Sequence, residues 1–130
     1  MIVVDANVVA TALADDGVDG ERARRRLRGE RLTAPALLDL EVLSVWRRLA
    51  AAGALSERRV EQAMADLAEL RMDRVDHRPL LGRCWELRHN VTVYDAAYVA
   101  LAEALDLVLL STDARLAASP GIRCMVELLS

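Results

Sequence analysis

The chain has 130 residues, 54% of them hydrophobic, and a formal net charge of -3. This length and apolar content suit one compact domain with a substantial core, and we expect a single domain over residues 1–130. The slightly negative charge excludes a uniformly cationic surface, so attraction for phosphate must come from a local patch. With no Phe and only two Trp and two Tyr residues, the composition also argues against the base-stacking sheets of RRM-type proteins.

The sequence indicates neither export nor membrane insertion. A charge is reached at Asp5, and no apolar run approaches the roughly 20 residues that a membrane span needs. The two cysteines, Cys84 and Cys124, lie in apolar surroundings without metal-ligand or redox spacing, so we expect buried, reduced thiols. The expected location is the cytoplasm.

Short apolar strands alternate with helices along the chain. We expect strands at residues 2–4, 31–34, 72–75, 106–111 and 122–126. We expect helices at residues 6–14, 21–31, 35–52, 56–70, 79–89 and 92–105. Pro35 stands where it would open the third helix, and Ser56 begins a capping box for the fourth. This order predicts an α/β fold, a three-layer α/β/α sandwich around a central, mostly parallel sheet of four to five strands.

Four acidic residues are expected at the carboxyl edge of this sheet, where such folds bind their ligands. Asp5 ends the first strand, and Asp113 follows the fourth strand by a short turn. Asp95 opens the helix over residues 92–105, and Glu41 lies at the rim of the apolar stripe of the helix after the second strand. Helices that follow parallel strands begin at the same edge, so the four carboxylates should converge.

Each acid taken singly has a structural explanation. Asp5 and Asp113 suit helix N-caps, Asp95 completes a capping box, and Glu41 suits an exposed helix position. Their shared edge favours a joint role, because clustered carboxylates repel one another and stay ionised only with a cation among them. Oxygen ligands of this kind select Mg²⁺ or Mn²⁺ over zinc, and no His or Cys set with zinc spacing competes with them.

Four segments together resemble PIN domains, and most closely the VapC toxins of bacterial type II toxin–antitoxin modules. They are Ile-Val-Val-Asp-Ala-Asn at residues 2–7, the stretch at 35–42 that begins with Pro and ends with Glu-Val, Tyr-Asp-Ala-Ala-Tyr-Val-Ala-Leu-Ala at 94–102, and Leu-Ser-Thr-Asp-x-x-Leu at 110–116. The resemblance covers nearly the whole chain in the right order and spacing.

This resemblance implies an endoribonuclease that uses Mg²⁺ or Mn²⁺. The family's catalytic and metal-binding acids fall on Asp5, Glu41, Asp95 and Asp113. Asn7 and Thr112 match supporting polar positions that help to orient water or ligands. The resemblance also implies inhibition by a cognate VapB-type antitoxin, and a homodimer within a toxin–antitoxin hetero-oligomer. RNA as the substrate rests on the family likeness alone, and four carboxylates are compatible with one metal ion or two.

Two further features have alternative explanations. The cationic stretch from Glu21 to Arg31, with its arginines from Arg22 onward, could guide RNA towards the acids, but a solvated charged face explains it equally well. Asp39 is an alternative to Glu41 as the acid that this helix contributes to the site. Its position on the helical wheel, however, suits a favourable interaction with the helix dipole in the first turn.

Rival function classes fit the residues less well. Haloacid-dehalogenase-like phosphatases and receiver domains use a lysine near the phosphate, and this chain contains no Lys; no P-loop sequence is present either. Structure-specific 5′ nucleases that cut DNA are usually longer and carry more acids. The main alternative is a catalytically silent PIN-like scaffold that only binds other proteins, and metal-dependent cleavage would separate it from an enzyme.

Overall fold

A five-stranded, entirely parallel sheet forms the centre of the molecule. The computed structural model describes residues 1–129, and its strands lie in the order β3-β2-β1-β4-β5. The strands are β1 (Ile2–Val4), β2 (Leu32–Pro35), β3 (Met72–Val75), β4 (Leu109–Ser111) and β5 (Val126–Leu128). The first strand in sequence is the central one, because it pairs with β2 on one side and β4 on the other.

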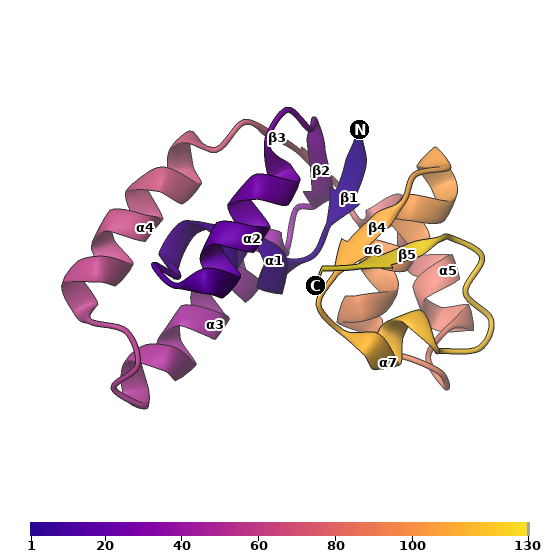
Figure 1. The fold of residues 1–130 in the computed structure, drawn as a ribbon. Coiled ribbons are helices and arrows are strands. Elements are labelled where there is room, and N and C mark those ends of the chain that lie inside the picture. Colours follow the sequence, from indigo (N-terminus) through magenta and orange to yellow (C-terminus); the bar gives the residue numbers. More distant parts are fainter. Residues whose placement is uncertain (130) are drawn as a thin grey trace.

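Helices flank this sheet in the manner predicted for an α/β sandwich. They are α1 (Ala6–Ala14), α2 (Val18–Leu27), α3 (Leu38–Ala51), α4 (Glu57–Glu69), the 3₁₀ helix η1 (Arg78–Leu80), α5 (Leu81–Glu86), α6 (Val93–Leu105) and α7 (Ala114–Ala117). Figure 1 shows α1 to α4 on one side of β1, and α5, α6 and α7 gathered with β4 and β5 on the other. The predicted fold class is confirmed.

The core is one cluster of aliphatic side chains around β1. All three residues of β1 are buried, and residues 96–102 of α6 are buried without interruption. Four of these seven α6 residues are Ala, and their small side chains allow the helix to contact β1, β2 and β4 closely. The largest core side chain, Trp46, is fully buried, and its indole Nε1–H donates to the Ala10 carbonyl at 3.2 Å.

Two predicted boundaries around the second and fourth strands were wrong. Pro35 ends β2 instead of opening a helix, because the parallel pairing with β3 continues through it to Val75. The fourth strand begins only at Leu109, since Asp106 adopts φ 54° and caps the C-terminus of α6. A left-handed residue cannot continue either a helix or a strand.

Three other segments differ from prediction. The last strand was expected at residues 122–126, but it is β5, whose register is set by pairing of Val126 with Leu109. The helix expected at residues 79–89 divides into η1 and α5, because Pro79 in the first turn favours a separate short helix. The arginine-rich helix begins at Val18 and ends at Leu27, just before Gly29 takes φ 79°.

The structure also shows the burial of the two cysteines and the length of each helix. Cys84 is buried, Cys124 is half-buried, and both are free thiols. None of the helices in residues 1–129 has the length and apolar character that a bilayer crossing requires.

Replacement of Trp46 by Ala should lower the free energy of unfolding by about 3–5 kcal/mol, because it removes a large buried side chain and leaves the Ala10 carbonyl without its donor. Urea denaturation measures this change. Leu40→Ala on the same helix, at a side chain that is 73% exposed, is the control and should change stability by less than about 0.5 kcal/mol. Equal losses for the two variants would contradict the described core.

Candidate active site

Asp5 connects the central strand to the first helix. Its carboxylate caps α1 by accepting a hydrogen bond from the Val8 amide at 2.9 Å, and its own amide donates to the Leu110 carbonyl at 3.1 Å. The residue is only 9% exposed, and burial raises the pKa of its carboxyl. Hydrogen bonds from the Ser111 hydroxyl and from the Val8 and Thr112 amides oppose this pKa shift, while the charge of Asp95 adds to it.

Glu41 reaches the same region from α3. The Tyr98 hydroxyl donates to its Oε1 at 2.7 Å and thereby fixes the direction of the carboxylate. Partial burial raises the pKa of Glu41, and the negative charges of Asp95 and Asp5 raise it further. Burial and the adjacent Glu41 carboxylate also raise the pKa of Tyr98, so this hydroxyl stays protonated and can donate.

Asp95 and Asp113 line one pocket of about 470 Å³ between α6 and α7. Asp95 lies in the first turn of α6, where its amide donates to the hydroxyl of the N-cap Thr92 at 3.1 Å, as the capping-box pattern predicted. Asp113 caps α7 by accepting from the Arg115 amide at 2.9 Å. Burial raises the pKa of Asp95, and repulsion from Asp113 adds to the rise.

The four acids therefore affect one another electrostatically across a single edge of the sheet. Asp95 acts on both Asp5 and Glu41, and Asp113 acts on Asp95. Among residues 1–129, however, no three His, Cys, Asp or Glu side chains are arranged closely enough to hold a metal ion by themselves.

This arrangement fits a hard divalent cation that keeps part of its water shell. Mg²⁺ is usually bound through one or two carboxylates together with waters and substrate phosphates, and seldom by a cage made of protein ligands alone. The donor set here is all carboxylate oxygen, and mutual repulsion between the acids would be relieved by positive charge among them. The assignment of the four acids as metal ligands stays a prediction.

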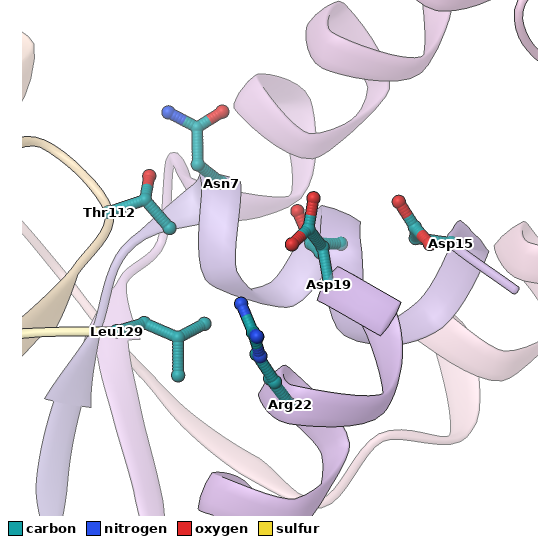
Figure 2. A pocket seen from close by; sticks show the side chains of 7 residues that line it. Asn7, Asp15, Asp19, Arg22, Thr112 and Leu129 are labelled. Carbon is teal, nitrogen blue, oxygen red and sulfur yellow. The ribbon is translucent and has the colours of Figure 1, made fainter. Parts of the chain in front are cut away.

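The two supporting polar residues, Asn7 and Thr112, line a second pocket, of about 350 Å³. Figure 2 shows Asn7 and Thr112 near one end of this pocket and Arg22 and Asp19 of α2 across from Thr112, while the amide of Asn7 projects away from α2. Asn7 is two residues after Asp5, and Thr112 directly precedes Asp113. Both predicted positions are therefore beside the acids, although they do not line the pocket that contains Asp95 and Asp113.

Tyr98 and Ser111 contribute to the site, and the sequence analysis gave neither a role. Tyr98 is one helical turn beyond Asp95, so the two share a face of α6, and that spacing was the available signal. Ser111 is fully buried at the end of β4, where it accepts from the Asp113 amide at 3.0 Å and hydrogen-bonds Asp5. The feature of the sequence that could have indicated Ser111 is a polar residue at the end of an otherwise apolar strand.

Comparison with known proteins identifies the family. A PIN domain family model matches residues 2–121. Ribonuclease VapC1 of Mycobacterium tuberculosis is 46% identical over 127 residues, which cover 97% of this chain and 96% of that protein. Ribonuclease VapC12 of the same organism is 35% identical over 130 residues and covers both chains completely. The chain belongs to the PIN-domain family, among the VapC ribonucleases.

Solved structures share the fold of this VapC-family chain at low sequence identity. VapC20 of Mycobacterium tuberculosis, described as a toxin that cleaves the sarcin–ricin loop, superposes with a TM-score of 0.69 at 17% identity, over 95% of this chain and 97% of that one. VapBC2 of Rickettsia felis, bound to a DNA fragment from its promoter, gives a TM-score of 0.68 at 13% identity and full coverage of both chains.

One aspartate and two histidines near the site of this VapC-family protein have other surroundings than the four acids. Asp39 lies in the first turn of α3, as expected, but forms a two-point ion pair with Arg74 at 2.7 and 2.9 Å. His89 lines the pocket of Asp95 and Asp113, whereas His77 lies in a separate apolar pocket beside Trp85.

Glu41→Gln should stabilise the protein at pH 7 and leave its stability unchanged at pH 3. Because the folded chain raises the pKa of Glu41, the folded state holds the proton more tightly, and stability falls as pH rises from about 4.5 through the raised pKa. The amide removes that penalty and still accepts from Tyr98. Urea denaturation at both pH values tests this, with exposed Glu61→Gln on α4 as the control. Destabilisation by Glu41→Gln at pH 7 would contradict the argument.

Proposed function

We propose that the chain is the toxin of a type II toxin–antitoxin module and an endoribonuclease that depends on Mg²⁺ or Mn²⁺. The observation that carries the proposal is that hydrogen bonds from the Val8 amide and the Tyr98 hydroxyl hold the carboxylates of Asp5 and Glu41 at the carboxyl edge of the sheet. The charge of Asp95 raises the pKa of both acids, as expected for carboxylates that lie near one another. Membership of the VapC ribonucleases supports RNA as the substrate. We propose the cytoplasm as the location of this activity, because RNA is available to the enzyme there.

The acids Asp5, Glu41, Asp95 and Asp113 would hold the cation. When bound, Mg²⁺ or Mn²⁺ would offset the charge of the phosphate and lower the pKa of a water bound to the ion, so that hydroxide forms more readily. The reaction consumes one water for each P–O bond that breaks, and it uses no protein nucleophile.

The remaining residues of the site keep the acids in position. The Val8 amide and the Ser111 hydroxyl hold the Asp5 carboxylate, and Tyr98 holds that of Glu41. These hydrogen bonds stabilise the charged forms of the acids, which are the forms that bind a cation. Asn7 and Thr112, which line the adjoining pocket, would orient water or the RNA.

A VapB-type antitoxin and a second copy of this chain are the proposed protein partners. The structural neighbour from Rickettsia felis, described as VapBC2, supports the first. Exposed apolar side chains support a homodimer, and they include Leu40 on α3, Trp85 on α5 and Tyr94 on α6. On α3, Leu38, Val42 and Trp46 belong to the core, whereas Leu40 and Leu49 are exposed and available to a partner.

The purified chain should cleave a mixed-sequence single-stranded RNA in Mn²⁺, and EDTA should abolish the cleavage. Asp95→Asn should reduce the rate by more than about 100-fold, because loss of a ligand exceeds the usual effect of losing a residue that only supports one. Labelled RNA on a denaturing gel gives the rate. If the wild-type chain cleaves nothing, or if EDTA and Asp95→Asn have no effect, the silent protein-binding scaffold becomes the better explanation.

Mg²⁺ should stabilise the folded protein independently of any cleavage. At about ten times the dissociation constant, binding adds roughly 1.4 kcal/mol, which raises Tm by about 5 °C in a chain of this size. Thermal unfolding with and without 10 mM Mg²⁺ or Mn²⁺ measures the shift, and Asp95→Asn should lose most of it. An equal shift in Asp95→Asn would mean that the cation binds elsewhere on the chain.

A further inference from the structure

The pocket of about 350 Å³ beside the acids is built partly by the same segments that carry them. Asn7 follows Asp5 in the first turn of α1, and Thr112 connects β4 to Asp113. The amide of Thr112 itself hydrogen-bonds the Asp5 carboxylate. One end of this pocket therefore adjoins the acidic site directly.

The opposite wall of the pocket comes from α2 and supplies a cation. Arg22 is exposed, and Figure 2 shows its guanidinium pointing from α2 towards the end where Asn7 and Thr112 lie. Arginine binds phosphate well because its planar N–H groups match two phosphate oxygens at once. Asn7 and Thr112 provide neutral donors at the same end of the pocket.

Arg22 differs from the arginines that follow it on α2, which are used within the fold. Arg24 donates to the carbonyls of Ala12 and Asp15, at 3.0 and 2.7 Å. Arg25 pairs with Glu21, and Arg26 pairs with Glu30 and Glu127. Within residues 1–129, Arg22 makes neither an ion pair nor a hydrogen bond, so its donors are available to a ligand.

Two acidic side chains also line the pocket and oppose an anion there. Asp15 is partly neutralised by its turn, since its Oδ1 accepts from the Gly17 amide at 2.7 Å. Asp19, one turn before Arg22 on α2, has no such bond in the described part of the chain. Asp19 should therefore weaken anion binding, and its effect should be opposite in sign to that of Arg22.

The pocket that Asp95 and Asp113 line also contains cations. Arg88 and Arg115 line it, and the Arg115 side chain is 96% exposed, with Nε 3.7 Å from an Asp113 oxygen. Two pockets that contain arginine are thus associated with the acids: Asp95 and Asp113 line one, and Asn7 and Thr112, the neighbours of Asp5 and Asp113 in sequence, line the other. A polynucleotide whose reacting phosphate is at the acids has further phosphates on both sides of it.

We propose that the Arg22 pocket is a phosphate-binding subsite for single-stranded RNA, in which Arg22, Asn7 and Thr112 hold a backbone phosphate next to the one that is cleaved. The proposal rests on the ribonuclease function proposed above and assigns one part of α2 to the substrate. Of the other arginines in this stretch, Arg24 holds α2 to the carbonyls of Ala12 and Asp15, and Arg26 holds it to Glu127.

The test is binding of a fluorescently labelled 12-nucleotide single-stranded RNA, measured by anisotropy in the Asp95→Asn background so that the RNA stays intact. Arg22→Ala should raise Kd by about tenfold. The slope of log affinity against log salt concentration should fall by about 0.7, the value for one phosphate contact on a single strand. Asp19→Asn should lower Kd, because it removes the opposing charge.

Arg28→Ala is the matched control, since Arg28 is exposed on the same basic stretch, outside the pocket, and its loss changes the net charge equally. It should change Kd by less than about twofold. Equal effects of Arg22→Ala and Arg28→Ala, or no tightening by Asp19→Asn, would overturn the subsite. Failure of the unsubstituted chain to cleave RNA is a separate result that counts against the ribonuclease proposal, because binding is measured without cleavage. Circular dichroism confirms that each variant folds.

Discussion

The burial of Asp5 at the end of the central strand is the constraint around which the site is organised. A carboxylate with so little exposure is unfavourable when charged, and the presence of Asp95 and Glu41 makes it more so. The fold offsets this penalty with amides at the start of α1 and with the Ser111 hydroxyl. The acids keep an excess of negative charge, and a divalent cation or an arginine can neutralise it.

Much of the fold follows from local sequence pattern, because β-branched strands and Ala-rich helices alternate clearly. The predicted bounds of strands and helices were wrong where contacts with other segments determine the local conformation. Pro35 remains in β2 because β3 pairs alongside it, and β5 begins at Val126 because β4 sets its register. Asp106 has a left-handed conformation that no periodicity signals.

The acids of the site were easier to predict than the residues around them. Asp5 and Asp113 follow strands, so parallel-sheet geometry alone placed them at one edge. The contact of Tyr98 with Glu41 joins positions 57 residues apart, and no local pattern encodes it. Arg22 differs from Arg24, Arg25 and Arg26 because those three side chains contact carboxylates or carbonyl oxygens. These contacts can be seen only in the folded chain.

The acids come from four separate parts of the chain, at residues 5, 41, 95 and 113, and β4, the strand before the last of them, is held in the sheet by β5 at residues 126–128. A protein folds progressively during its synthesis, from its N-terminal end. The first acid is thus made almost at once, whereas the set is complete only when nearly the whole fold has formed. A nascent chain that has not reached residue 113 lacks one of the four acids, so the proposed toxicity cannot begin before most of the domain has been synthesised.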